Sequence, residues 1–246
     1  MSDQIHLYGF APVRQCLLNN NRSYRILYIK DKGRSPRLKE LEQLARKRGI
    51  TVQRLNRYQL GTLAGTKLHQ GTVLRCSELR MITPGDFLAS TAASDKKLLV
   101  ALDQVEDPQN VGAIIRTAAF LGASGLITLG KKAAPLTPAV SKASAGALEY
   151  FPIIQVVNLA DCLNRLRSEA FSVVGASSDN SMDFREVPVT DFMVLVMGNE
   201  GQGLRRLTQK RCDHLIHIHG NQSIESLNVN AASAILIQHL LHQIFG

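Results

Sequence analysis

The sequence predicts an α/β protein with a small, basic N-terminal domain and a larger domain built on a mostly parallel sheet. Its 246 residues are 45% hydrophobic, which is enough for one large core or two smaller ones. From Leu98 onward, short apolar runs typical of strands alternate with amphipathic stretches typical of helices. This alternation predicts a parallel sheet with helices on both faces. Residues 1–76 hold 15 Lys and Arg against 4 Asp and Glu, whereas residues 77–246 hold 14 against 16.

Residues 1–76 are expected to form the small domain. Helices are predicted at residues 8–18 and 36–48, the second with leucines at helical spacing and a stop at Gly49. Strands are predicted at residues 25–29, 51–55 and 71–76. Residues 77–97 contain Thr83-Pro-Gly-Asp86 and a stretch of small polar residues, so they are expected to form a linker.

Residues 98–246 are expected to form the larger domain. Its predicted strands are residues 98–103, 125–129, 151–156, 171–176, 192–197 and 214–218. Its predicted helices are residues 111–121, 137–147, 159–169, 204–210 and 229–245. The last helix carries the apolar residues Ile235, Leu236, Leu240 and Ile244, which fit either the core or a dimer interface.

The charge distribution points to a polyanion as partner. Clustered Lys and Arg attract phosphates by displacing condensed counterions, so the basic residues 1–76 are expected to bind nucleic acid. A well-solvated basic surface is the alternative. Aromatic residues make up only 5% of the chain, which favours recognition of RNA backbone and shape over a base-stacking platform.

Composition also narrows the location and the cofactor chemistry. No apolar run has the length of a membrane span, and the first residues lack a leader pattern, so we expect a cytoplasmic protein without membrane contact. The four cysteines are scattered, which favours buried free thiols. Cys212, His214, His217 and His219 could be drawn as a metal cluster, but a second ligand pair at defined spacing is missing and no metal is expected.

Three segments place polar residues directly after strand-like runs, where a parallel sheet usually binds its ligand. The first is Asp103-Gln-Val-Glu-Asp-Pro-Gln-Asn-Val-Gly-Ala-Ile-Ile-Arg-Thr-Ala118. Here Asp107-Pro108 favours a turn and Asn110 is expected to cap a helix that begins at Val111. Arg116 lies about two turns into that helix. In isolation, a helix cap and a solvated arginine would explain both polar residues.

The second segment, Met197-Gly-Asn-Glu-Gly-Gln-Gly203, is neither a dinucleotide fingerprint nor a Walker A loop. It places Glu200 among glycines that would let a ligand approach the backbone closely. The third segment, Ser226-Leu-Asn-Val-Asn-Ala-Ala232, precedes the last helix, and either Ser226 or Asn228 could cap that helix.

Taken in order, the three segments resemble the three motifs of the SpoU (TrmH-like) RNA 2′-O-ribose methyltransferases of the SPOUT superfamily. The residues that carry the resemblance are Asp107-Pro-x-Asn-Val-Gly-Ala-x-x-Arg-Thr-Ala, Val196-Met-Gly-x-Glu-Gly-x-Gly and Ser226-Leu-Asn-Val. Tyr8-Gly9 with Val13, and His69-Gln70-Gly71, resemble the N-terminal substrate-binding domain of the subgroup that methylates a guanosine of 23S ribosomal RNA. The resemblance covers nearly the whole chain.

The resemblance implies a trefoil-knotted C-terminal domain, an N-terminal domain like ribosomal protein L30e, and a homodimer. It also implies S-adenosylmethionine as the methyl donor, bound near Met197, Gly198, Ile218, Leu227 and Asn228. Arg116 would act on the ribose 2′-hydroxyl, with Asn110, Glu200, Ser226 and Asn228 arranging it and the RNA. A guanidinium normally stays charged, so Arg116 could equally bind phosphate or stabilise a developing alkoxide.

This sequence departs from the family pattern at two positions. His219 stands where relatives often have proline, and Asn230 stands where serine is frequent. Because Ser226-Leu-Asn-Val is intact, we expect methyltransferase activity to be retained, and the subgroup resemblance implies ribosomal RNA as the substrate. The alternatives are a transfer RNA ribose methyltransferase and a non-catalytic RNA-binding assembly factor. A small-molecule nucleotide enzyme ranks last, because no dinucleotide fingerprint follows the strand at residues 98–103.

Overall fold

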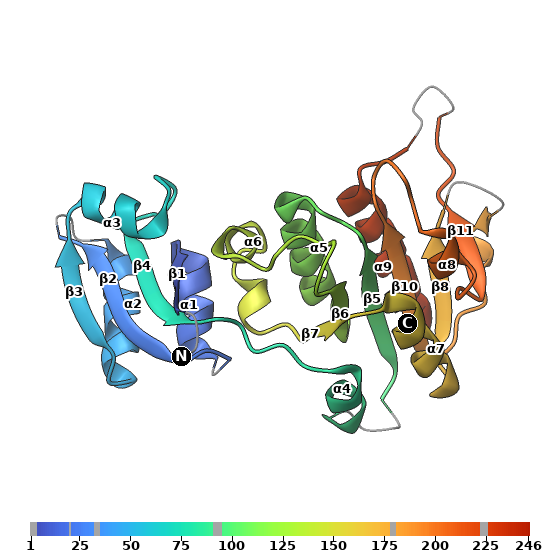
Figure 1. The fold of residues 1–246 in the computed structure, drawn as a ribbon, viewed down its shortest axis with the longest axis horizontal. Coiled ribbons are helices and arrows are strands. Elements are labelled where there is room, and N and C mark those ends of the chain that lie inside the picture. Colours follow the sequence, from blue (N-terminus) through green and yellow to red (C-terminus); the bar gives the residue numbers. More distant parts are fainter. Residues whose placement is uncertain (1–3, 20, 32–34, 91–94, 178–180, 222–225) are drawn as a thin grey trace. The chain divides into compact units, whose positions relative to one another are not determined.

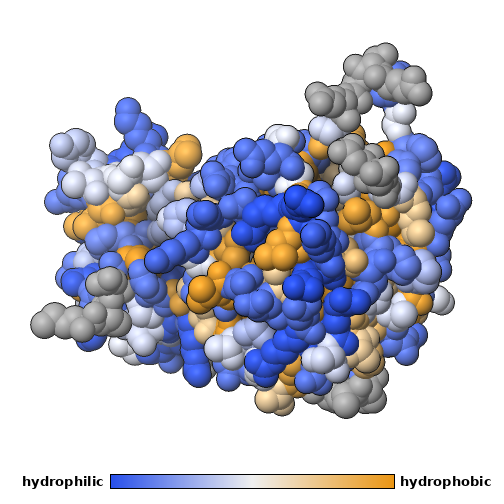
Figure 2. Space-filling model, turned by 45° about the vertical axis from the view of Figure 1, so that its right-hand side comes forward, coloured by the Kyte–Doolittle hydropathy of each residue, from blue (hydrophilic) through white to orange (hydrophobic). Residues whose placement is uncertain are grey.

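A computed structural model describes residues 4–19, 21–31, 35–90, 95–177, 181–221 and 226–246. The chain divides into two compact units (Figure 1). Unit 1 consists of Met1–Arg80 with Leu136–Tyr150, and unit 2 consists of Met81–Pro135 with Phe151–Gly246. Hydrophilic side chains cover most of the face drawn in Figure 2, because most of the large apolar side chains lie in the cores.

Unit 1 is built on a four-stranded sheet in the order β1-β4-β2-β3. The strands are β1 (Gln4–Tyr8), β2 (Tyr24–Lys30), β3 (Thr51–Leu55) and β4 (Thr72–Ser77). β4 is antiparallel to both of its neighbours, whereas β2 and β3 are parallel. The helices α1 (Phe10–Leu18) and α2 (Pro36–Lys47) pack on one face, and α3 (Arg57–Ala64) packs on the other. Alternation along the strands explains this division: Leu7 and Leu74 face the first pair, and Tyr8 and Val73 face α3.

The start of the chain differs from the sequence prediction. The predicted helix at residues 8–18 begins only at Phe10, and strand β1 precedes it. Gly9 separates the two elements with a φ of +96°, a backbone conformation that favours glycine. Helix α3 was not predicted, although its signal is present: the Asn56 side chain accepts from the Gln59 N–H and the Gln59 side chain accepts in return, which forms a capping box.

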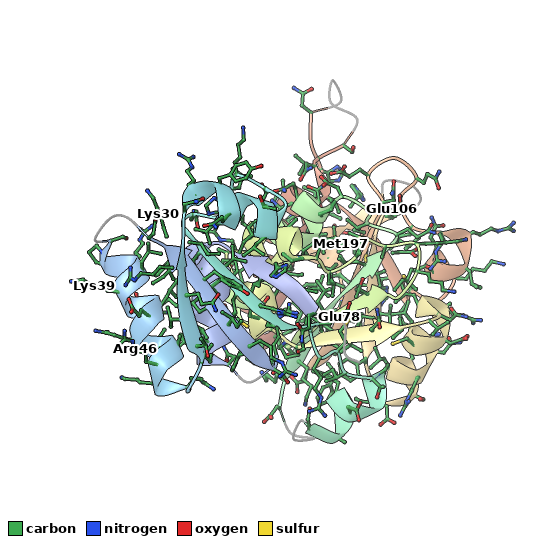
Figure 3. The ribbon with its side chains drawn as sticks, turned by 60° about the vertical axis from the view of Figure 1, so that its left-hand side comes forward. Lys30, Lys39, Arg46, Glu78, Glu106 and Met197 are labelled. Carbon is green, nitrogen blue, oxygen red and sulfur yellow. The ribbon has the colours of Figure 1, made fainter. Side chains whose placement is uncertain are left out.

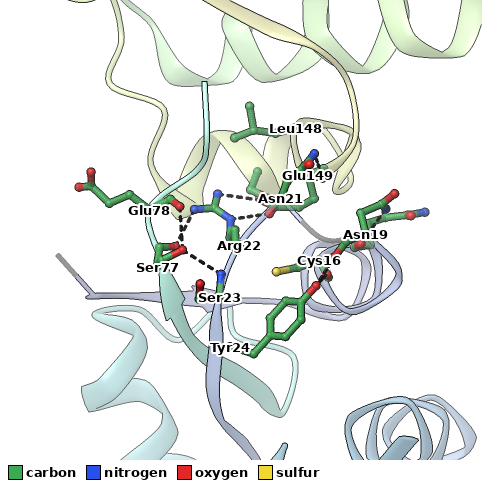
Figure 4. A network of polar contacts seen from close by, with 12 residues as sticks. Cys16, Asn19, Asn21, Arg22, Ser23, Tyr24, Ser77, Glu78, Leu148 and Glu149 are labelled. Atoms are coloured by element: carbon green, nitrogen blue, oxygen red, sulfur yellow. Dashed lines mark hydrogen bonds and ion pairs between the residues drawn. The ribbon is translucent and has the colours of Figure 1, made fainter. Parts of the chain in front are cut away.

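Residues 136–150 belong to unit 1, a difference from the predicted division into 1–76, 77–97 and 98–246. This segment contains α6 (Pro138–Ala143) and the short helix η1 (Ala147–Glu149). The Glu149 carboxylate accepts from the Arg22 guanidinium at 2.6 and 3.0 Å, with both side chains at most 1% exposed (Figure 4). Ser141 donates to the same carboxylate at 2.7 Å. A buried carboxylate needs such partners, so the pair holds this segment in unit 1.

The expected linker is also partly structured. Residues 84–90 form α4 (Pro84–Ser90), whose Phe87 is buried in the core of unit 2, and Ile82 pairs with Ile154. Residues 91–94 lie outside the described residues.

Unit 2 confirms the predicted parallel sheet. Its seven strands run in the order β7-β6-β5-β10-β8-β11-β9, and every neighbouring pair is parallel. They are β5 (Lys97–Asp103), β6 (Gly125–Leu129), β7 (Ile153–Val156), β8 (Ser172–Ala176), β9 (Met182–Asp183), β10 (Phe192–Gly198) and β11 (His214–His217). The central strands β5 and β10 are almost wholly buried, as expected for a sheet covered on both faces.

Helices cover both faces of this sheet. α4 and α7 (Leu159–Ser168) share one core cluster with Leu99 and Ala101 of β5. α5 (Pro108–Leu121) and α9 (Val229–Phe245) pack against each other, and α9 contacts β5 and β10 (Figure 1). The short helices η2 (Phe184–Glu186) and α8 (Arg206–Gln209) complete the unit. Of the helices in the described part of the chain, none is long and apolar enough to cross a membrane.

Candidate active site

The start of α5 places Asn110 differently from the sequence prediction. The helix begins at Pro108, and its N-cap is Asp107, whose carboxylate accepts from the Gln109 N–H at 2.9 Å. The expectation that Asn110 caps a helix beginning at Val111 was therefore wrong. Proline is favoured in the first turn because its missing N–H needs no partner there. With the cap supplied by Asp107, the Asn110 amide is available for another contact.

The loop after β10 is a tight turn that presents Glu200. Asn199 and Gly203 exchange two backbone hydrogen bonds, at 3.1 and 2.8 Å. The Asn199 side chain donates to the Gln104 carbonyl and accepts from the Gly201 N–H, both at 2.9 Å. A Cβ on Gly198 would lie 2.4 Å from the Gly203 carbonyl carbon, so only glycine fits at that position. The loop conformation is thus held by backbone contacts on both sides of Glu200.

Asn228 connects the third motif to the first two. It is the N-cap of α9, and its side-chain oxygen accepts from the Asn230 N–H at 3.0 Å. Its amide nitrogen donates to Glu200 Oε1 at 2.6 Å and lies 3.2 Å from Asn110 Oδ1. Asn110 Nδ2 donates to the same Glu200 oxygen at 2.8 Å. Three residues separated by up to 118 positions therefore form one hydrogen-bonded cluster, as the order of the motifs predicted.

The other two residues predicted to act in catalysis are not part of this cluster. Arg116 is exposed on α5 and makes no hydrogen bond or ion pair within the described part of the chain. It is six positions beyond Asn110, so the two side chains project about 120° apart around the helix. Ser226 is also exposed, and it lies beside the pocket described next.

A pocket of about 580 Å³ lies at the carboxyl ends of β8, β10 and β11. Four of the five residues predicted to bind the cofactor line it, as do Glu200 and Ser226; the four are Met197, Gly198, Ile218 and Leu227. Asn228, the fifth, lies next to Leu227 in sequence but does not line the pocket. Ala176 and Ser177 of the β8 end line it as well. This is the edge of the sheet at which α/β proteins usually bind ligands.

The structure adds an ion pair that the sequence analysis missed. Asp103, with a fully buried side chain at the end of β5, accepts from Arg205 Nε at 2.6 Å and from the Arg205 N–H at 3.0 Å. The pair ties the far end of the Glu200 loop to the neighbouring strand. An aspartate in the last position of an apolar strand was the available signal, because a buried carboxylate requires a partner. Gln209, which lines the pocket, was missed too, and His217 was considered only as a metal ligand and not as a pocket residue.

The two histidines at the end of β11 contact each other. Their rings meet edge to face with centroids 4.3 Å apart, and Ser181 Oγ lies 3.1 Å from His217 Nδ1. His219 lies 3.5 Å from Asp183, and a hydrogen bond from the Arg185 guanidinium lowers the pKa of that carboxyl. Among the residues that the structure describes, no three His, Cys, Asp or Glu side chains are placed to hold a metal ion.

Comparison with known proteins identifies the family of each part of the chain. The model of the SpoU rRNA methylase family matches residues 97–238, and that of the RNA 2′-O ribose methyltransferase substrate-binding domain matches residues 6–82. The 23S rRNA (guanosine-2′-O-)-methyltransferase RlmB of Haemophilus influenzae is 36% identical, with 100% of both chains covered. That of Coxiella burnetii is 36% identical over 99% of this chain and 97% of the relative.

A solved structure shows the same fold. The AdoMet-bound rRNA methyltransferase from Sinorhizobium meliloti superposes with a TM-score of 0.82, covering 99% of this chain and 88% of that chain at 25% identity. The resemblance inferred from the three motifs is thereby confirmed, and the chain belongs to the SpoU rRNA methylase family.

Proposed function

We propose that this protein is an S-adenosylmethionine-dependent RNA 2′-O-ribose methyltransferase that modifies a guanosine of 23S ribosomal RNA. The observation that carries the proposal is the cluster of Asn110, Glu200 and Asn228 beside the pocket at the carboxyl ends of the strands. The choice of 23S ribosomal RNA and of guanosine rests on the full-length relatives, which are named for that reaction.

The pocket suits S-adenosylmethionine in size and in lining. Its volume of about 580 Å³ falls in the usual range of small-molecule sites. Gly201 leaves the backbone accessible, and Ile218 and Leu227 supply apolar walls. S-adenosylmethionine held by this lining would supply a methyl group on a sulfonium. The ribose 2′-oxygen would form the new bond to carbon as the carbon–sulfur bond breaks, S-adenosylhomocysteine would leave, and the 2′-hydroxyl proton would pass to solvent water.

The residues around the pocket act mainly by positioning. Methyl transfer needs the nucleophile aligned behind the methyl group, so rigid placement of the ribose lowers the barrier. Glu200 is fixed by two amide donors, and Asn228 is fixed in turn as the cap of α9. Ser226 at the pocket edge offers a hydroxyl to the RNA or the cofactor. Arg116 binds a phosphate next to the target ribose or stabilises negative charge on the 2′-oxygen.

We propose that the active form is a homodimer in which α5 and α9 lie at the interface. Phe120 is 86% exposed and follows Arg116 by one helical turn, so the two share a face of α5. Ile235 and Phe245 of α9 are 40% and 56% exposed, whereas Leu236, Leu240 and Ile244 lie in the core. Covering these apolar side chains would bring Arg116 into the interface. The trefoil knot, the L30e-like N-terminal domain and a cytoplasmic location are part of the same proposal.

The test is transfer of labelled methyl from S-adenosylmethionine to unmodified 23S ribosomal RNA and, in parallel, to bulk transfer RNA. Product is mapped by the alkali resistance of the phosphodiester next to the methylated ribose. Label at one guanosine of 23S RNA supports the proposal. Label only in transfer RNA overturns the substrate, and cofactor binding without transfer favours a non-catalytic assembly factor.

Arg116→Ala tests the catalytic assignment. We expect turnover to fall at least tenfold while RNA affinity changes little, since one contact is removed from a large RNA interface. Arg165→Ala, which removes an exposed arginine from α7 on the opposite face of the sheet, is the matched control and should retain turnover. Equal turnover of the two variants would contradict the role of Arg116.

A further inference from the structure

Unit 1 contains a second pocket, of about 550 Å³. It lies where β2 ends and where α1, α2 and α3 begin, next to the turn that precedes β4. In Figure 3, Lys30 marks the end of β2, and Lys39 and Arg46 mark two positions on α2. Every lining residue comes from unit 1, whereas every candidate active-site residue comes from unit 2. The two pockets are therefore separate sites.

The pocket gathers cations that lack acidic partners. Lys30, Arg37, Arg57 and Lys67 line it, and among the described residues no Asp or Glu does. None of these four forms an ion pair within the described residues. Elsewhere in unit 1, three glutamates are engaged: Glu40 pairs with Arg14, Glu42 with Arg46 and Arg54, and Glu149 with Arg22. The lining of the pocket therefore carries a net positive charge, to which these four side chains contribute.

His69 adds a neutral hydrogen-bond donor to the lining. The residue is 3% exposed, and its Nδ1 accepts from the Gly71 N–H at 3.1 Å. Burial, followed by the nearby charges of Arg57 and Lys142, lowers the pKa of His69. The ring is therefore uncharged at neutral pH, with its proton on Nε2. Gln70 and Gly71 both have positive φ, at +54° and +82°, which holds the turn that places His69.

Phe10 gives the pocket an apolar wall. The Gln70 side chain accepts from the Phe10 N–H at 3.0 Å, which fixes the start of α1. The Arg37 guanidinium lies 5.4 Å from the centre of the Phe10 ring. A ring next to several cations is the combination with which proteins bind single-stranded RNA, because the base stacks while the cations hold the phosphates.

We propose that this pocket binds one unpaired nucleotide of the substrate RNA, distinct from the nucleotide that is methylated. Its base lies against Phe10, and its flanking phosphates contact Lys30, Arg37, Arg57 and Lys67. His69 donates from Nε2 to the base or ribose. This inference rests on the proposed function in that the ligand is RNA. The new element is that unit 1 recognises an unpaired nucleotide of the RNA, in addition to attracting the RNA by its charge.

The test compares two double variants of the full-length protein that remove equal charge. Lys30→Ala/Lys67→Ala empties the pocket of two lysines. Lys39→Ala/Lys47→Ala removes two exposed lysines of α2 that do not line it. The affinity for a 23S ribosomal RNA fragment is measured over a range of salt concentrations. We expect the pocket variant to bind roughly tenfold more weakly and to lose about 1.4 from the slope of log affinity against log salt, at about 0.7 per phosphate contact.

The control variant should bind within about twofold of the unaltered protein. A third variant, His69→Asn, keeps an oxygen that can accept from the Gly71 N–H but loses the ring donor. It should weaken RNA binding without changing the salt slope. In competition, a single-stranded oligonucleotide should displace the fragment more effectively than a perfect duplex of equal charge, and this preference should disappear in the pocket variant.

Equal losses in the two lysine variants would overturn the inference, because they would show diffuse attraction alone. Equal competition by duplex and single strand would overturn it as well. Methyl transfer assayed on the same preparations separates this result from the proposed function. If the pocket variant binds RNA more weakly but the unaltered protein transfers no methyl group, the proposed enzyme activity is rejected and the nucleotide-binding pocket is supported. If the pocket variant methylates normally and binds RNA with unchanged affinity, the pocket is rejected and the enzyme activity is supported.

Discussion

The buried pair of Arg22 and Glu149 should be the most sensitive position in unit 1. Glu149→Gln keeps the size of the side chain but leaves the guanidinium buried beside a neutral amide. Burial lowers the pKa of Arg22, and the hydrogen bonds and charge of Glu149 outweigh it and raise that pKa. Glu149→Gln removes this compensation, but a guanidinium is not deprotonated in proteins, so the variant buries a charge without a counter-charge. Breaking a buried ion pair at one partner costs about 3–5 kcal/mol.

The assay is thermal and urea unfolding of the full chain. At about 2–4 °C per kcal/mol for a chain of this length, a loss of about 3 kcal/mol lowers the unfolding midpoint by roughly 6 °C or more. Arg46→Ala is the control, because its ion pair with Glu42 is exposed, with the arginine 72% accessible, and such pairs contribute about 0–1 kcal/mol. Arg22→Met/Glu149→Leu should recover most of the stability, since it removes both charges together. Equal midpoints for Glu149→Gln and Arg46→Ala would refute the reasoning.

Three further predictions concern the site, the thiols and pH. Glu200→Ala removes the acceptor shared by Asn110 and Asn228 and should lower turnover by roughly a hundredfold, whereas Glu200→Gln keeps an acceptor oxygen and should lose less; kcat with saturating RNA decides between them. Burial raises the pKa of Cys162 to about 11 and that of Cys212 to about 12, so both should react with a thiol reagent at pH 8 only after unfolding, and rapid labelling of the native protein would contradict this. The pKa of His69 is lowered in the folded protein, so the unfolded chain takes up a proton more readily as the pH falls below 6.5. The contribution of His69 to the free energy of unfolding is therefore complete above pH 6.5 and declines below it. His69→Asn should flatten the acid side of a plot of unfolding midpoint against pH.

The parts of the fold that depend on local patterns could be predicted from the sequence. The apolar runs at residues 98–103 and 192–197 correctly predicted the central parallel strands. A strand that is buried on both faces is apolar along its whole length, as β5 and β10 are. The position of residues 136–150 could not be predicted in this way. It depends on Glu149 meeting Arg22, which lies 127 positions earlier, and neither residue carries a local signal of its partner. The strand at residues 4–8 was not predicted for a different reason: it is short, and only Gly9 separates it from α1.

The candidate site shows the same division between local and distant information. The order of the motifs predicted that Asn110, Glu200 and Asn228 belong to one site, and the structure places them within hydrogen-bonding distance. However, the residues next to Asn110 in the sequence led to the wrong prediction that Asn110 is the N-cap of this helix. Asp107 fills that position, and this is what frees the Asn110 amide to hold Glu200.

The two capping arrangements also differ in a way that bears on function. Asn228 does both jobs at once, because its oxygen caps α9 while its nitrogen donates to Glu200. Asn228→Asp would keep the cap, since aspartate is an equally good N-cap residue, but would place a second carboxylate against Glu200. Stability should therefore change little from the cap itself, while the Glu200 contact is replaced by repulsion. Asp107→Asn, by contrast, should leave both the cap and the site intact. The paired substitutions separate the capping role of each residue from its role in the site, which a single alanine replacement at either position cannot do.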